Sequence, residues 1–190
     1  GRIWSCTVEP YGYPIKPAAA TASSAQAGMG PEKTIDGSGM TGDLHGTEAT
    51  TMWTSTGALP NWIQYQFDKI YKLHELKVWN SNGPVEPYIG FGAKQVTVET
   101  SLDGTTWKAV ENVPEFARGP GKPSYAANTT VNLGGAEAKY VRLTVNTTWG
   151  GLNVSGLAEV QFTYAPLQAR APQPANGATG VSVDTSLNWR

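Results

Sequence analysis

Trp62-Ile63-Gln64-Tyr65-Gln66-Phe67 decides the fold class of this chain, because apolar and polar residues alternate along it. A period of two places Ile63, Tyr65 and Phe67 on one face of an extended strand and the two glutamines on the other. A strand with one apolar face and one polar face is typical of an antiparallel sheet that covers a core on one side.

Three further stretches, 75–78, 95–99 and 141–145, repeat this alternation. Turn signals bound the runs, such as Leu102-Asp103-Gly104-Thr105 and Asn132-Leu133-Gly134-Gly135. Glycine (22 residues) and proline (13 residues) are abundant, and no stretch has the pattern of a capped amphipathic helix. We therefore predict an all-β chain folded as an antiparallel β-sandwich or jelly roll.

The composition limits the class of partner. The chain has 190 residues, enough for one domain with a sizeable core, but only 15% are charged and the formal net charge is −1. A broad basic surface for nucleic acid or anionic lipid is therefore not expected. No apolar run reaches membrane-spanning length, so membrane insertion is not expected either. The seven tryptophans serve a core, or offer flat faces that stack on the C–H patches of sugars.

The single cysteine, Cys6, excludes an intramolecular disulfide. A secreted domain of this size then depends on core burial and on a bound metal for stability. No signal peptide is visible and the chain begins at Gly1, so we expect a processed or excised fragment.

The chain divides into three zones. Residues 1–16 form an N-terminal edge segment, with Trp4 packed on the main domain, and residues 17–165 form the β-sandwich. Residues 166–190 start with a Pro/Ala linker and continue into the truncated start of a following β domain. We therefore expect one module of a longer chain, monomeric when isolated.

Six short motifs follow one another along residues 17–165. They are Ile35-Asp36-Gly37, Thr51-Met52-Trp53-Thr54-Ser55, Trp62-Ile63-Gln64-Tyr65-Gln66-Phe67, Ser101-Leu102-Asp103-Gly104-Thr105-Thr106-Trp107, Ala138-Lys139-Tyr140-Val141-Arg142-Leu143 and Ala158-Glu159-Val160. In this order they resemble the discoidin, or F5/8 type C, domain family, and most closely its bacterial family 32 carbohydrate-binding modules. The resemblance implies a galactose-binding-like jelly roll. The chain departs from the family at Ser38 to Thr50, where a longer loop replaces a short turn.

The resemblance also implies a structural Ca²⁺. The implied ligands are the carboxylates of Asp36 and Glu159, carbonyls near Lys33 and Ser38, Thr51, and the carbonyl of Ala158. The sequence itself supplies the two carboxylates at opposite ends of the domain with glycines nearby, and a hard cation prefers such oxygen ligands. The alternative is that Asp36 caps a turn and Glu159 is a solvated strand end.

Relatives of this fold bind ligands through loops at one end of the sandwich. Three loops here carry suitable groups: the insertion with Asp43, the stretch from Trp79 to Tyr88, and Asn146-Thr147-Thr148-Trp149-Gly150-Gly151. A sugar needs an aromatic platform and a few polar groups that match its hydroxyls. The predicted carbohydrate-binding residues are Trp149, Trp79, Asn80, Asn82, Glu86, His45, Asp43 and Arg118.

These candidates each have a simpler alternative. Trp149 is the best platform, because small neighbours leave its ring exposed, but the ring would also fit as a lid over the core. Trp79 ends a strand, where packing competes with ligand stacking. His45 and Arg118 are solvated loop residues if they touch no ligand. We expect three tryptophans in the core, at positions that pack inside in the family: Trp53, Trp62 and Trp107.

Two other function classes fit less well. An enzyme has little support, because the chain has two histidines and neither a His-Glu-x-x-His nor a Gly-x-Ser-x-Gly motif. Asp43 and Glu86 are the carboxylates that a glycosidase would use. A protein-binding adhesion module stays open. We predict a noncatalytic carbohydrate-binding module of a secreted or cell-surface bacterial protein, with a binding free energy of about −4 to −8 kcal/mol for one short glycan.

Overall fold

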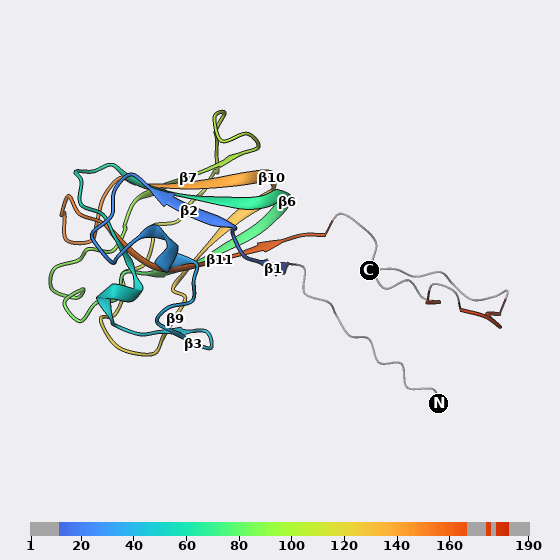
Figure 1. Ribbon diagram of the computed structural model, residues 1–190, viewed down its shortest axis with the longest axis horizontal. Coiled ribbons are helices and arrows are strands. Elements are labelled where there is room, and N and C mark those ends of the chain that lie inside the picture. Colours follow the sequence, from blue (N-terminus) through green and yellow to red (C-terminus); the bar gives the residue numbers. More distant parts are fainter. Residues whose placement is uncertain (1–11, 167–173, 176–177, 183–190) are drawn as a thin grey trace.

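The computed structural model describes residues 12–166, 174–175 and 178–182, in which nearly all regular structure is β-strand (Figure 1). The strands are β1 (Tyr13–Ile15), β2 (Ala19–Ala22), β3 (Met40–Thr41), β4 (Leu44–His45), β5 (Trp53–Thr54), β6 (Asn61–Asn80), β7 (Val96–Ser101), β8 (Lys108–Ala109), β9 (Tyr125–Ala126), β10 (Thr129–Val145) and β11 (Gly156–Tyr164). Two single-turn 3₁₀ helices, η1 (Pro31–Thr34) and η2 (Ala49–Thr51), lie between them. In this described part, no helix has the length and apolar character needed to cross a membrane. The predicted all-β class is confirmed.

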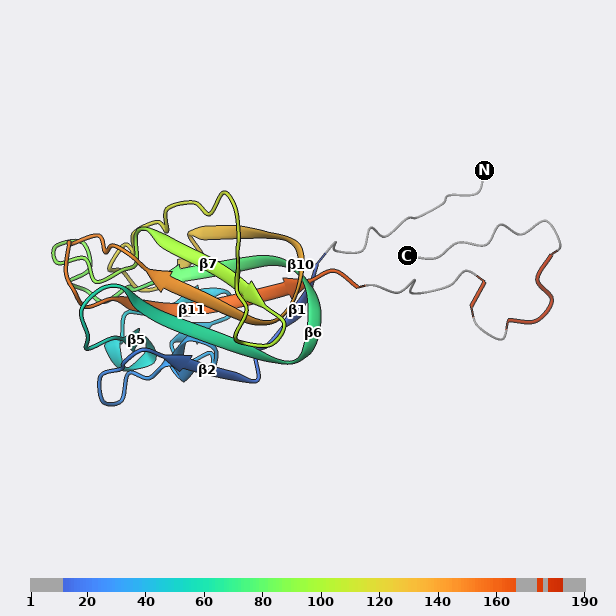
Figure 2. The ribbon, with the colours of Figure 1, turned by 90° about the horizontal axis from the view of Figure 1, so that it is seen from above.

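The two longest strands, β6 and β10, are shared by both layers of the sandwich. They pair antiparallel from Asn61↔Val145 to Gln66↔Tyr140 and again, after a register shift, from Tyr71↔Ala138 to Val78↔Thr129. Both curve around one end of the molecule (Figure 2). Their halves near β2, β7 and β8 form one layer, and their halves near β1 and β11 form the other. Both ends of β6 therefore lie at the opposite end of the sandwich, among the loops.

The core fills the space between the layers as the alternation predicts. Ile63, Tyr65 and Phe67 are fully buried. The ring of Phe162 from the other layer packs edge-on against Tyr65 and Phe67, with centroids 5.4 and 5.2 Å away. Tyr65 also shares a 3.0 Å hydrogen bond with the Thr34 hydroxyl, which fixes η1 to the sheet. The apolar face of the sequence pattern is thus the inner face of the sandwich.

Of the three tryptophans predicted in the core, only Trp53 is fully buried. Trp62 and Trp107 are half-buried on the outer face of the sheet, where the Arg142 guanidinium lies 5.1 and 4.1 Å from their ring centroids. Trp62 precedes the inward-facing Ile63, so the period of two turns its side chain outward. The core prediction was wrong for these two residues.

The insertion from Ser38 to Thr50 is folded, although the sequence predicted only a loop. Its strands β3 and β4 form a hairpin, and β4 also pairs with β9, giving a separate three-stranded sheet. This sheet covers a second apolar cluster beside the main core: Met52, Trp79, Tyr125 and Ala158, with Met40 and Ala127 packed against them. The N-terminal segment before residue 12, with Trp4 and Cys6, and nearly all of the predicted linker and following domain lie outside the described residues.

Candidate functional site

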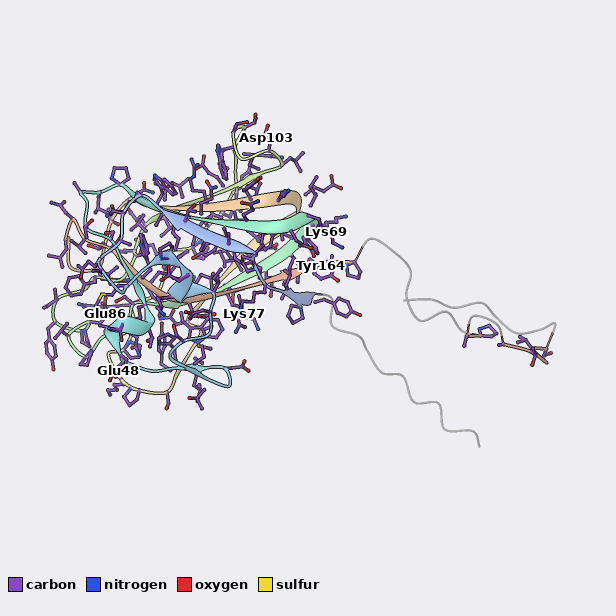
Figure 3. All side chains as sticks on the ribbon, in the orientation of Figure 1. Glu48, Lys69, Lys77, Glu86, Asp103 and Tyr164 are labelled. Atoms are coloured by element: carbon purple, nitrogen blue, oxygen red, sulfur yellow. The ribbon has the colours of Figure 1, made fainter. Side chains whose placement is uncertain are left out.

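Long connections gather at the end of the sandwich opposite the bend of β6 and β10 (Figure 1). They are residues 81–95 between β6 and β7, residues 110–124 before β9, and residues 146–155 between β10 and β11. Glu86 and Glu48 mark this loop end, whereas Lys69 and Tyr164 mark the other end (Figure 3). Four of the sequence-predicted binding residues lie in these loops, Trp79 and Asn80 end β6 just before the first of them, and Asp43 and His45 lie in the β3–β4 hairpin.

Asn80 and Asn82 are fully buried and use their side chains inside the protein. The Asn80 amide donates to the carbonyls of Ala93 and Ala117, at 2.7 and 2.8 Å, and its oxygen accepts from two backbone N–H groups. The Asn82 amide donates to the Gly46 and Lys122 carbonyls, both at 2.8 Å, and its oxygen accepts from Gly121. The prediction that these two side chains contact sugar is wrong in this conformation, because they tie the loops together instead.

Glu86 has the same internal role. It is fully buried, and its two carboxylate oxygens accept from the backbone N–H groups of Phe91 (3.1 Å) and Gly92 (2.8 Å). Burial raises the pKa of this carboxyl above its ordinary value, while these hydrogen bonds and the Arg118 charge lower it in part. Arg118 is half-buried and donates from Nη2 to the Glu86 carbonyl. Glu86 and Arg118 therefore hold the backbone of the 81–95 loop through internal hydrogen bonds. Both carboxylate oxygens of Glu86 are used in this way, so Glu86 offers no free carboxylate to a ligand.

The insertion explains the position of Trp79. Its side chain is only 2% exposed, and its indole N–H donates to the Asp43 carbonyl in the hairpin turn at 3.2 Å. Trp79 is thus a core residue of the second cluster, and the prediction that it is a stacking platform was wrong. The Asp43 side chain is exposed at the turn.

His45 is fully buried beneath the same hairpin, so the prediction of direct ligand contact is wrong for it as well. Its Nδ1 donates to the Gly46 carbonyl at 2.9 Å, which leaves Nε2 as an acceptor. This Nε2 has no hydrogen-bond partner among the described residues, and it lies beside Gly39.

Trp149 is half-buried at the surface of the loop end. Its indole N–H donates to the Phe116 carbonyl at 2.9 Å, and the Lys94 ammonium lies 4.9 Å from the ring centroid. Lys94 also lies 3.8 Å from the exposed carboxylate of Glu115. The indole is therefore held in one orientation by its edge, and part of its surface remains accessible.

Two loops carry this tryptophan as one unit. The Trp149 N–H donates to the Gly92 carbonyl at 3.0 Å, and the Gly150 N–H to the Gly90 carbonyl at 2.8 Å. A Cβ placed on Gly150 would lie 1.6 Å from the Ile89 carbonyl oxygen, so only glycine allows this approach. The 81–95 and 146–155 loops are thus joined along their backbones.

Sequence reasoning missed one exposed aromatic in the first of these loops. Tyr88 is 87% exposed, and Val85 and Ile89 beside it are 46% and 41% exposed. The sequence did contain a signal for this. The apolar residues do not alternate with polar ones in the stretch Pro84-Val85-Glu86-Pro87-Tyr88-Ile89-Gly90, so they do not fit a strand. Apolar residues without a sheet period, between prolines and a glycine, indicate an exposed loop surface.

The two carboxylates among the predicted metal ligands, Asp36 and Glu159, lie close enough for the charge of Asp36 to act on Glu159. Lys33 lies 3.3 Å from the Asp36 carboxylate, and Asp36 accepts from the Ser38 N–H at 2.7 Å. The Thr51 hydroxyl donates to the Glu48 carbonyl at 2.6 Å and faces Gly39, where an added Cβ would lie 2.6 Å from it. The register of β11 shifts between Leu157 and Glu159, which leaves Ala158 as an extra residue opposite β6.

Among these residues, Glu159 is the one whose pKa is raised. It is 4% exposed, and its Oε2 is buried without a hydrogen-bond partner among the described residues. Burial and the charge of Asp36 raise the pKa of Glu159 to about 8, while a backbone hydrogen bond from Gly37 and the charge of Lys16 lower it in part. Hydrogen bonds from Ser38 and Lys33 outweigh burial at Asp36 and lower its pKa. A buried, unpartnered carboxylate oxygen close to a second carboxylate fits a hard cation.

Asp36 and Glu159 border a groove of about 460 Å³ that residues of β1, β11 and the turn after η1 line together. No group of three or more His, Cys, Asp and Glu side chains suited to a metal occurs in the described part of the chain. A cation here would therefore need backbone carbonyls for the rest of its ligands.

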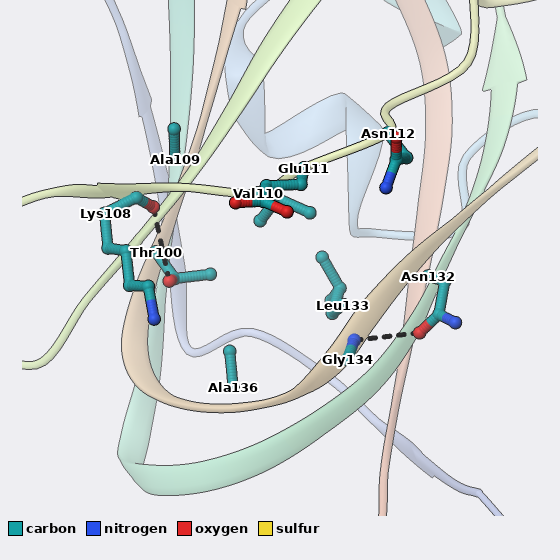
Figure 4. A pocket seen from close by; sticks show the side chains of 10 residues that line it. All are labelled: Thr100, Lys108, Ala109, Val110, Glu111, Asn112, Asn132, Leu133, Gly134 and Ala136. Atoms are coloured by element: carbon teal, nitrogen blue, oxygen red, sulfur yellow. Dashed lines mark hydrogen bonds between the residues drawn. The ribbon is translucent and has the colours of Figure 1, made fainter.

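A second hollow lies far from these residues, between β8 and the bend of β10 (Figure 4). Its volume is about 490 Å³. Two of the hydrogen bonds at its wall stay inside the protein, from Thr100 to the Lys108 carbonyl and from the Gly134 N–H to Asn132. It contains none of the predicted site residues.

The fold is an antiparallel β-sandwich whose long connections gather at one end and are joined there by hydrogen bonds. The chain belongs to the F5/8 type C domain family, whose sequence profile matches residues 19–160. None of the curated proteins matches the chain.

Solved structures share the fold. One is the CBM32 of AlyQ in complex with 4,5-unsaturated mannuronic acid, at 17% identity and a TM-score of 0.56 over 79% of this chain and 97% of that one. The family 32 CBM from C. perfringens NanJ, in complex with galactose, has 16% identity and a TM-score of 0.52 over 76% and 92% of the two chains. CBM32-3 from a family 31 glycoside hydrolase of Clostridium perfringens has 22% identity and a TM-score of 0.52 over 80% and 90%. At these identities the likeness concerns the fold.

Proposed function

We propose that this chain is a noncatalytic glycan-binding module. The observation that carries the proposal is Trp149, an accessible indole held in one orientation by its bond to Phe116 on two joined loops. An aromatic ring fixed at a surface binds the apolar face of a sugar with little loss of conformational entropy. Family membership and the sugars bound to similar modules support the same function.

The buried polar residues would act indirectly in this function. Asn80, Asn82 and Glu86 hold the loops in place, so that a sugar meets a surface that is already ordered. The neighbouring Lys94 and Glu115 are exposed enough to reach hydroxyl or charged groups of a glycan. Glu86 uses both carboxylate oxygens internally, which supports recognition without catalysis, since a glycosidase needs two available carboxyl groups.

A structural Ca²⁺ is part of the proposal. Asp36, Glu159 and carbonyls near Lys33, Ser38, Thr51 and Ala158 would hold it, and the ion would neutralise two carboxylates that the fold brings together. Its position at η1 and β11 would connect the first and last parts of the domain. We also infer an extracellular setting in a bacterial multidomain protein, because similar modules occur in glycoside hydrolases of Clostridium perfringens.

A glycan array tests the proposed function. We expect the chain to bind at least one glycan, with a dissociation constant between about 1 mM and 1 μM for a short site of this type. Trp149→Ala should weaken that binding by about tenfold or more. Trp107→Ala, which removes a half-buried indole from the outer sheet face, is the matched control and should leave binding unchanged. Equal binding by the wild type and Trp149→Ala would show that the platform lies elsewhere.

A further inference from the structure

An apolar crest stands at the tip of the 81–95 loop. It consists of Val85, Tyr88 and Ile89, which are 46%, 87% and 41% exposed. Most large apolar side chains in the described part of the chain are buried or half-buried, so such a group of three at one loop tip needs a reason.

The crest is exposed although the loop that carries it is held by hydrogen bonds. The N–H groups of Tyr88 and Ile89 both donate to the Val85 carbonyl, at 3.0 and 2.9 Å, which makes a compact turn. Inside the turn, the buried Glu86 carboxylate accepts from the Phe91 and Gly92 N–H groups. A buried carboxylate that organises the backbone around it is costly unless it is satisfied, and here it holds the crest in a fixed place.

The crest lies next to Trp149. A Cβ placed on Gly90 would be 2.8 Å from the Trp149 carbonyl carbon, so the two backbones touch at this point. Tyr88 is two residues before Gly90, and two residues span at most about 7 Å. The backbones of Tyr88 and Trp149 therefore lie within about 11 Å of each other, on loops that are joined by hydrogen bonds.

We propose that Tyr88 is a second stacking platform, so that this face takes two or more linked pyranose residues of one glycan chain instead of a single terminal sugar. The proposal rests on the proposed function and extends it. Backbones that lie within about 11 Å of each other allow the two rings to meet neighbouring or next-neighbouring sugars of one chain. Val85 and Ile89 would lie against the C–H faces of the same sugars. A membrane partner is disfavoured, because the nearby Lys94 is paired with Glu115 and the formal net charge is −1.

Binding of each sugar as a monosaccharide and as its tetrasaccharide tests this inference. The probes are galactose, glucose, mannose and mannuronate, measured by calorimetry or surface plasmon resonance. For wild type, the tetrasaccharide of the best sugar should bind about tenfold more tightly than the monosaccharide. Tyr88→Ala should reduce this ratio to about one to two, and Tyr88→Phe should keep it. Ile70→Ala, which removes an apolar side chain that is 52% exposed at the opposite end, should also keep it.

Three outcomes would overturn the inference. The first is a wild-type ratio near one, and the second is a tenfold ratio that survives Tyr88→Ala. The third is a crest that serves another partner, seen as vesicle binding or self-association that Tyr88→Ala abolishes while the glycan ratio stays unchanged. Binding of monosaccharides without a gain from length would leave the proposed function in place. Failure of the wild type to bind any probe or any array glycan would reject both.

Discussion

Glu159 is a buried carboxylate whose pKa the fold raises well above its ordinary value. A carboxylate that is 4% exposed and close to a second carboxylate is unfavourable when ionised, and its pKa rises to about 8. The unfolded chain has an ordinary glutamate pKa near 4.5. Between these two values the metal-free folded protein holds a proton that the unfolded chain has released. Its stability must therefore fall as the pH rises through this window.

In the presence of EDTA, the melting temperature should fall steadily from pH 5 to pH 8. The loss amounts to at most about 1.4 kcal/mol per pH unit, the free energy that corresponds to a difference of one bound proton. Glu159→Gln removes the titrating group and should flatten this slope, whereas Glu115→Gln, at an exposed site, should keep it. Thermal melts at four pH values measure the effect. A wild-type melting temperature that rises over this range in EDTA would contradict the assignment.

The tryptophans show what a single sequence predicts at the scale of residues. Trp53 was correctly placed in the core, while Trp62 and Trp107 were not, although alternation alone would have turned Trp62 outward. Trp79 was unpredictable, because its burial depends on the insertion that folds over it. Exposure of a loop aromatic depends on contacts far away in the sequence, which local patterns do not contain.

At the scale of elements, the binding face depends on the contact between the two loops of residues 81–95 and 146–155. Gly150→Ala places a methyl group against the Ile89 carbonyl, and backbone atoms must separate to accept it. We expect a loss of about 1 to 3 kcal/mol in unfolding free energy, as for other overpacked sites. Glycan affinity should fall about tenfold, because Trp149 moves with the loop.

Urea denaturation and glycan titration of Gly150→Ala measure these two effects. Gly83→Ala is the matched control in the same face, since a Cβ there meets nothing within 4 Å. Wild-type stability and affinity in Gly150→Ala would mean that the two loops do not form one rigid unit.

The strands themselves were largely predictable, since β6, β7 and β10 occupy the stretches whose apolar residues alternate. The sequence did not indicate that β6 and β10 each continue through a bend into both layers. That continuity depends on residues such as Gly134 and Gly135, with φ of 62° and 73°, which were predicted as an ordinary turn. Strand pairing across a bend is a tertiary property, and a period of two says nothing about it.

For the whole molecule, the cation cluster and the glycan face are connected but not the same. The cluster lies at η1 and the bulge of β11. The insertion hairpin links it to the loop end, because the Gly46 carbonyl that follows β4 accepts a hydrogen bond from the Asn82 amide. Trp149 and Tyr88 lie beyond this connection, on loops that also have their own internal bonds. A cation at Glu159 would therefore stabilise the fold as a whole, while the sugar would meet other residues.

Calcium should consequently raise stability without being required for sugar contact. At about one hundred times its dissociation constant, a ligand of the folded state adds about 2.7 kcal/mol. For a domain of this size that is a rise of about 5 to 10 °C in melting temperature. Glu159→Gln should lose this rise, and Glu115→Gln should retain it.

Glycan titration at 20 °C, with calcium and with EDTA, completes the measurement. The affinity for the glycan should change less than threefold, because only one of the three side-chain hydrogen bonds of Asn82 joins it to the insertion. If chelation abolished glycan binding in a protein that remained folded, the cation would have to touch the sugar itself.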